Sequence, residues 1–478
     1  MRRCIGLALL LQSLVACSAA PTAQKAQKDS ELVQPSGPAT YKGFVQVSTL
    51  EPQPGLAIHH YRHAKSGLEV LVAPKPGSGV VAMVTAYEVG SRWEVNERTG
   101  LAHLFEHMMF RGTESYPKPF ETLSDWGGRF NAYTSPDVTV YFELVPKKLF
   151  GDAAKFEAER MRKLLITADG FDTERGAVVS ERKMRTEDSP TGRLYWELFQ
   201  LAYDRHPYKT GPIGWQEDLD ATSFEDALAF YERFYAPNRA ILSIVGDFSL
   251  KEALSVVDRY YGDFESEAFE APVIAAEPTR KGTRRKVIPM KVETVFLADA
   301  VFGPTYDDKH AAVDNLIANL LADGKLGYLA GQLVETGIAR SVSGDADPGM
   351  DRGLSTVLVI GNPGVSRGRV EAAYDAARGR FPSWLTAQRL ESFKLYYLAA
   401  QWASFRDPLH LAMQTASSAA TTGDPAWDLT FLSKVQGVTL ADVRARWPYW
   451  TTSARTRVIL EPAKTSAPLA PKKKGATR

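Results

Sequence analysis

Cysteine is almost absent from this chain of 478 residues. The only two, Cys4 and Cys17, lie close to the N-terminus, which excludes a disulfide framework or a cysteine-ligated metal site from the rest of the chain. A charge excess of one sign is absent too, because 57 basic residues oppose 56 acidic residues and leave a net charge of +1. Proteins that bind nucleic acid usually carry a clear basic excess. We therefore expect no nucleic-acid partner.

The apolar stretch near the N-terminus, Ile5 to Leu11, is too short to span a membrane well. A pair of arginines precedes it, and small residues lead from it into Cys17. The pattern resembles a bacterial lipoprotein signal at residues 1–17, in which cleavage leaves Cys17 to carry lipid and anchor the chain to a membrane. Ser18, in place of an aspartate, is typical of lipoproteins sorted to the outer membrane, so we expect a periplasm-facing location in the cell envelope. An ordinary secretory signal with a chance cysteine is the alternative.

What the chain does contain matches an ordinary globular protein, with 44% hydrophobic and 24% charged residues. Its length favours two or more domains. Residues 18–54 are mostly small and polar, which predicts a flexible tether, and residues 463–478 predict a disordered tail. A charged segment with proline and glycine predicts a linker at 266–286. This divides the folded part into a first domain at 55–265 and a second domain at 287–462.

Apolar periodicity predicts helices and strands in both domains, mixed along the chain and not strictly alternating. Predicted strands occupy residues 68–73, 80–89, 137–145 and 240–245, then 292–301 and 354–360. Predicted helices occupy residues 149–166, 173–186 and 250–261, then 310–321 and 328–335. This mixture favours an α+β fold over a doubly wound parallel sheet. The element types of the second domain echo the first, which raises the hypothesis of an internal duplication.

A further helix is predicted from Thr99 to Phe110, a segment without proline that is apolar on nearly every side. Such a helix is buried, so its polar side chains need partners in the protein interior. His103 and His107 are four positions apart and point the same way, so both can bind one metal ion. Glu106 lies beside them on nearly the same face. The order His-x-x-Glu-His is that of the inverted zinc-peptidase motif; two core histidines beside a buried glutamate are the alternative.

A catalytic zinc site needs a third protein ligand and an open position for water. The candidates lie on an acidic predicted helix, where Glu174 and Glu181 are two turns apart and project from one face. One of them can bind the metal while the other supports the site from behind. From the residues alone, the same pair also fits an ordinary solvated helix.

The segment His103-Leu-Phe-Glu106-His107-Met-Met-Phe-Arg-Gly-Thr resembles the motif of the pitrilysin and insulysin family of zinc metallopeptidases. The likeness is strongest to the short-chain branch that includes the mitochondrial processing peptidase. The third ligand of that family is a glutamate in a downstream segment that Glu174-Arg-Gly-Ala-Val-Val-Ser-Glu181 matches. The resemblance therefore implies that Glu181 is the third zinc ligand and Glu174 a supporting acid. Further matching segments are Phe130-Asn-Ala-Tyr-Thr134, His206-Pro-Tyr208 and Phe234-Tyr-Ala-Pro-Asn-Arg239.

The resemblance also implies two similar α+β domains, each a mostly antiparallel sheet covered by helices, which form one half of a clamshell peptidase. It implies Zn²⁺ as cofactor and peptides as substrates, hydrolysed with Glu106 as the general base. In the family the peptide lies extended against an edge strand. Here that strand would be the one carrying Asn131, Ala132 and Tyr133.

Family members work inside a chamber made from two such halves, so the resemblance implies that a second chain associates with this one. An Arg and a Tyr from the opposite half often help to bind substrate there. The equivalent segment here has Tyr328 in place of the Arg and Arg340 in place of the Tyr, and these side chains differ in charge and reach. We therefore favour a heterodimer with a related, metal-free chain over a homodimer. A non-catalytic scaffold subunit is the alternative function, and a zinc hydrolase of a non-peptide ester is another.

Overall fold

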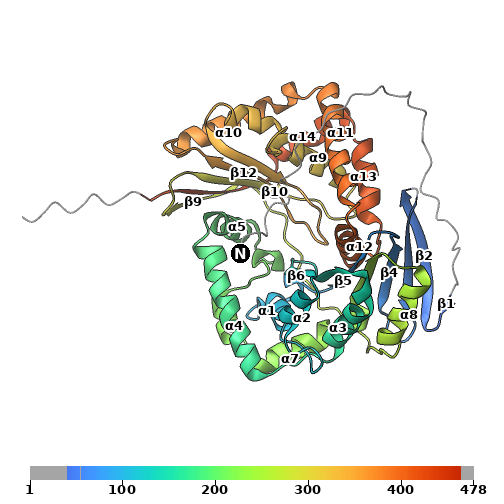
Figure 1. Cartoon of the computed structure of the whole chain (residues 1–478). Coiled ribbons are helices and arrows are strands. Elements are labelled where there is room, and N and C mark those ends of the chain that lie inside the picture. Colours follow the sequence, from blue (N-terminus) through green and yellow to red (C-terminus); the bar gives the residue numbers. More distant parts are fainter. Residues whose placement is uncertain (1–39, 54, 464–478) are drawn as a thin grey trace, which may run out of the picture.

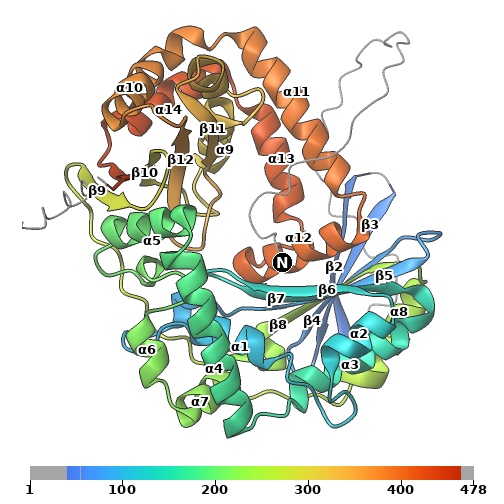
Figure 2. The same ribbon diagram turned by 60° about the vertical axis from the view of Figure 1, so that its left-hand side comes forward.

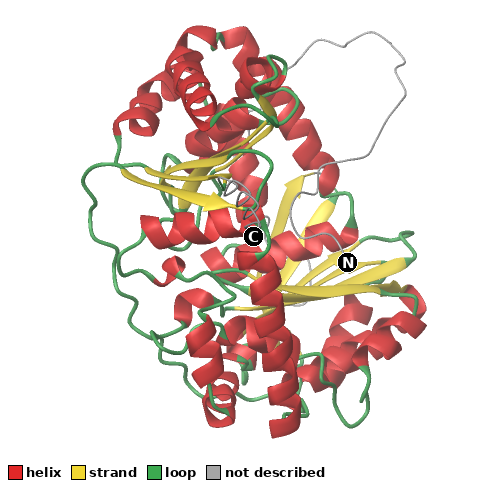
Figure 3. Cartoon of the chain, turned by 90° about the vertical axis from the view of Figure 1, so that its left-hand side faces the viewer, coloured by secondary structure: helices red, strands yellow, loops and turns green. Residues whose placement is uncertain are grey.

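The computed structural model describes residues 40–53 and 55–463, which form two β-sheets flanked by helices (Figures 1 and 3). The predicted signal with Cys17, residues 18–39 of the predicted tether and nearly all of the predicted tail lie outside these residues. Within the part of the chain that the structure describes, no helix is both long and apolar enough to cross a membrane.

The first sheet has eight strands in the order β1-β2-β3-β4-β8-β5-β7-β6. All neighbouring strands are antiparallel except β4 and β8, which are parallel. The strands are β1 Thr40–Tyr41, β2 Phe44–Gln53, β3 Leu56–His63, β4 Glu69–Pro74, β5 Val80–Tyr87, β6 Arg129–Thr134, β7 Thr139–Pro146 and β8 Ala240–Gly246. Because β6 ends this order, its outer edge carries backbone groups that pair with no other described strand.

Helices from the first half of the chain cover one face of this sheet (Figure 2). Their apolar sides, with Phe105, Ala154, Phe230 and Val257, join the sheet in one buried core. The helices of this half are α1 Leu101–Met108, α2 Pro119–Asp125, α3 Phe150–Arg162, α4 Ala168–Arg182, α5 Pro190–Ala202, α6 Gln216–Ala221, α7 Phe224–Phe234 and α8 Leu250–Tyr261. A π-helical segment, η3 (Lys183–Glu187), continues α4.

The second sheet has five strands in the order β11-β12-β10-β13-β9, parallel only between β13 and β9. Its strands are β9 Arg284–Met290, β10 Phe296–Phe302, β11 Ala339–Asp345, β12 Leu354–Gly361 and β13 Thr456–Pro462. The helices of this half are α9 Ala311–Ala322, α10 Arg367–Trp384, α11 Ala387–Ser404, α12 Pro408–Thr422, α13 Trp427–Gly437 and α14 Leu440–Thr452. The α+β prediction, with two mostly antiparallel sheets covered by helices, is confirmed.

The two halves exchange one helix each. From the first half, α5 packs on the second sheet, where Leu194 and Leu198 are buried with Phe296 of β10. From the second half, α12 packs on the first sheet, where Ala416 is buried with Val84 of β5. Figure 2 shows α12 on the face of the first sheet opposite α1. The central strands of the first sheet are therefore buried on both faces, by elements from both halves of the chain.

Two sequence predictions were wrong in detail. Residues 40–53 of the predicted tether contain β1 and the whole of β2, because β-branched side chains among the polar ones let this segment pair along β3. The last three residues of the predicted linker, 284–286, begin β9, which pairs with β13 in parallel. In both places the pairing partner is distant in sequence, and composition alone does not reveal it.

Candidate metal centre

The helix that carries the His-x-x-Glu-His segment is α1, shorter than the predicted 99–110. It starts after Gly100, whose φ of 93° lies in the left-handed region that favours glycine. No side chain of the helix caps this end. Glu94 does so instead: its carboxylate accepts hydrogen bonds from the backbone N–H of Gly100 and of Ala102, both at 2.8 Å. The cap anchors the start of α1 one turn before His103.

The structure brings His103 and His107 of α1 together with Glu181 of α4. The two imidazole rings lie 4.9 Å apart, centroid to centroid. Glu181 Oε2 lies 3.2 Å from His107 Nε2 and 3.8 Å from His103 Nε2. Each of the three side chains offers a ligand atom within 4.8 Å of the others. We refer to these three residues as the donor cluster.

Glu174 does not join the donor cluster but lies directly behind it. Its Oε2 is 3.4 Å from His107 Nδ1, the ring nitrogen that faces away from Glu181. Its other oxygen accepts a hydrogen bond from Arg111 at 3.2 Å. On the opposite side, Arg185 of η3 lies 2.5 Å from Glu181 Oε1. Each glutamate thus has one oxygen toward a histidine and one toward an arginine.

The charges of these groups fit a cation site. Burial, then the neighbouring charge of His107, lower the pKa of His103 to about 3, so this ring is neutral. Burial also acts to lower the pKa of His107, but hydrogen bonds to Glu174 and Glu181 outweigh it and raise this pKa to about 9. Burial acts to raise the pKa of Glu181, yet the hydrogen bond with His107 and nearby positive charges bring it to about 2. At neutral pH one proton on His107 therefore supplies the positive charge between two carboxylates.

The donor types are those of a zinc site. Two imidazole nitrogens and one carboxylate oxygen are a ligand set that zinc takes when it keeps a position open for water. His103 Nδ1 is buried and has no hydrogen-bond partner among the described residues. The residues present therefore fit this metal.

Glu106 lies on α1 between the two histidines in sequence and is mostly buried. Its Oε2 accepts a hydrogen bond of 2.6 Å from the hydroxyl of Thr134, the last residue of β6. Burial raises the pKa of Glu106 above its ordinary value, and the Thr134 hydrogen bond opposes that rise. A carboxyl with a raised pKa is suited to accept a proton near neutral pH.

The donor cluster opens into a cavity of 580 Å³ beside the edge strand β6. Asn131 and Ala132 of this strand line it, together with Phe110 and Phe120. Tyr133 does not: its side chain points to the other face of the sheet, where its hydroxyl lies 3.1 Å from Ser417 Oγ of α12. Alternation places Tyr133 on the face opposite Ala132, since neighbouring side chains of a strand point to opposite faces. Of the three predicted substrate-binding residues, Tyr133 can therefore contribute only backbone groups.

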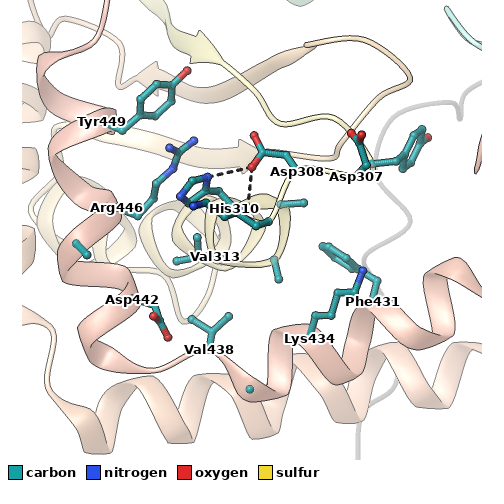
Figure 4. Close-up of a pocket in the computed structure, with 16 residues that line it drawn as sticks. Asp307, Asp308, His310, Val313, Phe431, Lys434, Val438, Asp442, Arg446 and Tyr449 are labelled. Atoms are coloured by element: carbon teal, nitrogen blue, oxygen red, sulfur yellow. Dashed lines mark hydrogen bonds and ion pairs between the residues drawn. The ribbon is translucent and has the colours of Figure 1, made fainter. Parts of the chain in front are cut away.

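A larger cavity, of 610 Å³, lies in the second half between α9, α13 and α14 (Figure 4). Its histidine, His310, is paired with Asp308 at 2.9 Å. Its arginine, Arg446, is paired through two hydrogen bonds with the buried Asp314. The described residues that line this cavity hold no group of potential metal ligands like the donor cluster. Among the described residues, the donor cluster is therefore the candidate metal site.

The two residues that stand in place of the family's Arg and Tyr, Tyr328 and Arg340, lie in different environments. Tyr328 is buried in the second half, where its ring packs against Trp384 at 4.9 Å between centroids. Apolar contacts therefore hold Tyr328 in the core of the second half. Arg340 is exposed on β11.

Two adjoining stretches of the chain match models of one peptidase family. Residues 70–210 match the insulinase model of peptidase family M16, and residues 222–379 match the model of the peptidase M16 inactive domain. The chain belongs to peptidase family M16. This is the pitrilysin and insulysin family that the sequence motif indicated, and the donor cluster lies within the first match.

Curated M16 relatives carry names of zinc proteases and processing peptidases. Zinc protease PqqE of Helicobacter pylori is 31% identical over 297 residues, which are 60% of this chain and 66% of that protein. A probable mitochondrial-processing peptidase subunit beta of Schizosaccharomyces pombe is 27% identical over 206 residues, which are 43% of this chain and 45% of that protein. The chain thus spans less than two thirds of the length of these relatives.

Solved structures agree with M16 membership. A protease from Helicobacter pylori superimposes with a TM-score of 0.79 at 25% identity, over 83% of this chain and 98% of that one. The periplasmic protease PqqL from Escherichia coli gives a TM-score of 0.68 at 19% identity, over 87% of this chain and 48% of that one, a likeness of fold alone. The prediction that the fold is one half of a larger peptidase shape is confirmed.

Sequence reasoning missed four side chains of this M16 site. Arg111 and Arg185 support the two glutamates, Thr134 holds Glu106, and Glu94 caps α1. Arg111 and Thr134 stand inside matched motif segments but had no assigned role. For Arg185 a signal was present, because it follows Glu181 by four positions on a predicted helix.

Proposed function

We propose that this chain is a zinc-dependent endopeptidase in which His103, His107 and Glu181 bind the zinc and Glu106 is the general base. The observation that supports it best is the donor cluster itself: three ligand atoms within 4.8 Å of one another, beside a buried carboxyl. Zinc, when bound there, polarises the peptide carbonyl and lowers the pKa of the attacking water. Glu106 accepts the proton of that water and passes it to the leaving amine. Glu174 keeps the His107 ring in place through Nδ1.

The proposed substrate is an extended peptide or an unfolded segment. Because the outer edge of β6 pairs with no other described strand, a peptide can add to it by main-chain hydrogen bonds. The cavity places the donor cluster next to Asn131 and Ala132 of that edge. Main-chain pairing tolerates many peptide sequences. Any preference for particular substrate side chains therefore depends on the residues that line the cavity. Phe110 and Phe120 stack at 4.9 Å on one wall and offer an apolar surface.

A non-catalytic scaffold subunit is the competing proposal, and the match to a model named for an inactive domain favours it. That match covers residues 222–379 and contains none of the donor cluster, nor Glu106. The half of the chain that does contain them matches the insulinase model. We therefore retain the peptidase as the proposed function.

We further propose that the protein works in the cell envelope, held to the outer membrane by lipid on Cys17. The solved relative PqqL is named a periplasmic protease, which supports an envelope location. Fractionation of cells expressing the full chain with Cys17→Ser tests the anchor: release from the membrane fraction is expected. Unchanged membrane association would assign the anchor to another segment.

The decisive experiment replaces Glu106 by Gln. The variant should keep close to one zinc per chain, because all three ligands remain, and should lose peptide cleavage by at least about 100-fold, because the base is gone. Zinc is measured by atomic emission and cleavage with a mixed peptide library, with and without chelator. Glu121→Gln is the matched control, since Glu121 lines the same cavity but pairs with Lys118. Full turnover by the Glu106 variant would remove this residue from the mechanism.

A further inference from the structure

The turn between β6 and β7 holds the side chain that touches the general base. Thr134, at the end of β6, donates its hydroxyl hydrogen to Glu106 Oε2 at 2.6 Å. The last torsion of a glutamate side chain is broad, so a carboxylate needs a fixed donor to hold one rotation. Thr134 is that donor, and its hydrogen bond engages Oε2 only. The direction of the Thr134 hydroxyl in turn depends on the position of residues 135–138, which form the turn.

From the first half, the turn is held by the segment after β5. The backbone N–H of Arg92 donates to the carbonyl of Pro136 at 2.8 Å. A Cβ on Gly90 would meet the carbonyl oxygens of Ser135 and Pro136 at 2.4 Å, so only glycine allows this approach. Both contacts involve backbone, and they fix one side of the turn.

From the second half, the loop between β11 and β12 holds the other side. The buried carboxylate of Asp137 accepts a hydrogen bond from the hydroxyl of Tyr208 at 2.6 Å and one from the backbone N–H of Met350 at 3.0 Å. The Tyr208 oxygen also accepts a hydrogen bond from the backbone N–H of Asp351 at 3.1 Å. One phenol hydroxyl therefore joins the turn, the His206-Pro-Tyr208 segment and the second half of the chain.

Charge reinforces this junction. The carboxylate of Asp351 lies 2.5 Å from Arg92 Nε and 3.1 Å from His206 Nε2. A Cβ on Gly349 would meet the Asp351 carbonyl at 2.8 Å and the Tyr208 hydroxyl at 3.1 Å, so the loop fits here only without a side chain. Residues that are more than 250 positions apart thus meet at the turn that follows Thr134.

We propose that Tyr208 and Asp137 form a latch between the two halves of the chain, and that this latch fixes the turn so that Thr134 positions the Glu106 carboxylate. The proposal rests on the function proposed above, since it assigns Glu106 as the base. Thr134 and Tyr208 are positioning residues: the first acts on Glu106 and the second acts through the turn. Displacements of about 1 Å at a reacting group can cost roughly 100-fold in rate, so such a latch has a measurable effect.

The test uses the full chain with zinc bound and four variants. Thr134→Val should lower kcat roughly 10- to 100-fold with unchanged KM and zinc content, while Thr134→Ser, which keeps the hydroxyl, should restore most of the rate. Tyr208→Phe should lower kcat several-fold. The double variant Thr134→Val with Tyr208→Phe should be no slower than Thr134→Val alone, because both changes act on one interaction.

Tyr203→Phe is the matched control. Tyr203 is as deeply buried as Tyr208, and its hydroxyl also joins the halves, by donating to the carbonyl of Arg352 at 2.7 Å. It makes no hydrogen bond to Asp137 among the described residues, and its ring, which packs edge-on against Tyr208, is kept in the Phe variant. It should lower the melting temperature about as much as Tyr208→Phe while leaving kcat unchanged. Equal loss of kcat in both tyrosine variants, or a double variant whose losses multiply, would overturn the latch.

A second measurement needs no turnover. Crystal structures of the zinc-bound parent and Tyr208→Phe proteins give the distance from Thr134 Oγ1 to Glu106 Oε2, which should lengthen in the variant. An unchanged distance also overturns the latch. A parent protein that binds zinc but cleaves no peptide would refute the proposed function alone, and the crystallographic comparison would still decide the latch.

Discussion

Two arginines, Arg111 and Arg185, stand behind the two glutamates of the site. The contact from Arg185 takes one oxygen of Glu181 and leaves Oε2 directed at both histidines. Side chains in such outer positions typically change metal affinity by 10- to 100-fold when removed. Removal of a side chain that binds zinc should therefore lower zinc affinity more than removal of a side chain that only supports a ligand.

The expected ranking of zinc affinity is specific. Glu181→Gln should lose zinc on dialysis, while Glu174→Gln and Arg185→Gln should keep it with affinity lowered about 10- to 100-fold. Competition with a fluorescent chelator measures the dissociation constants. Lys118→Gln is the control, because Lys118 lines the same cavity and, among the described residues, its amine pairs with Glu121 and with none of the donor cluster. Full zinc occupancy in Glu181→Gln would move the third ligand elsewhere.

Zinc uptake should release about one proton at pH 7. The pKa of His107 is raised to about 9, so this ring is protonated at neutral pH, and an imidazole must lose that proton before its nitrogen can bind a metal. Apparent zinc affinity should therefore fall about tenfold for each pH unit below 9. Calorimetric titration in two buffers of different ionisation enthalpy counts the protons. A smaller release is expected in Glu174→Gln, which lacks one of the hydrogen bonds that raise this pKa. Zinc binding without proton release would contradict the charge state assigned to His107.

At the residue scale, the sequence predicted which side chains of one helix lie together. It did not predict contacts between side chains of different elements. The spacing of His103 and His107 fixes their common direction on α1. The choice between Glu174 and Glu181 came from the family resemblance, because both residues face the same way on α4. Thr134 could not be assigned to Glu106, since nothing in a sequence states which strand end meets which helix.

At the scale of elements, α1 depends on a residue outside it. The helix begins without a cap of its own, and Glu94 satisfies two of its first N–H groups. Glu94→Ala should lower the free energy of unfolding by about 1–2 kcal/mol and weaken zinc binding, because the start of α1 loosens one turn before His103. Urea unfolding at fixed zinc concentration measures the change. Glu97→Ala is the control, since Glu97 precedes the same helix but makes no hydrogen bond through its side chain to the described residues of α1. Equal effects of the two substitutions would argue against the cap.

Sequence periodicity predicted most elements of the fold but not their partners. The predicted helix 250–261 coincides with α8, and the predicted strands at 240–245 and 354–360 differ from β8 and β12 by one residue each. The exchange of α5 and α12 was not foreseen, because an apolar helix face shows that a helix packs but not on which sheet. The segment predicted as helix 328–335 contains instead the π-helical Ala330–Val334, a form that periodicity of 3.6 does not represent.

At the scale of the whole molecule, the proposed partner is the open question that purification can answer. Of the two residues that stand in place of the family's Arg and Tyr, Tyr328 is buried and Arg340 is exposed, which supports a partner that supplies the missing substrate contacts. The chain purified alone should therefore cleave peptides poorly, and a related metal-free chain should restore activity. Light scattering gives the mass of each assembly. A fully active homodimer or monomer would exclude the heterodimer.

The helix exchange also sets an order of events during synthesis. Until α12 has left the ribosome, the strand face that carries Val84 has no cover, although β5 was made more than 300 residues earlier. The hydroxyl of Tyr133 likewise has no hydrogen-bond partner in Ser417 until α12 has been synthesised. The donor cluster is encoded in the first 181 residues but rests on a sheet that closes only after residue 422. A nascent or truncated first half would expose an apolar sheet, which makes it prone to aggregation and dependent on chaperones. Maturation of the metal centre is in this sense a late step of folding, delayed by the position of one helix in the gene.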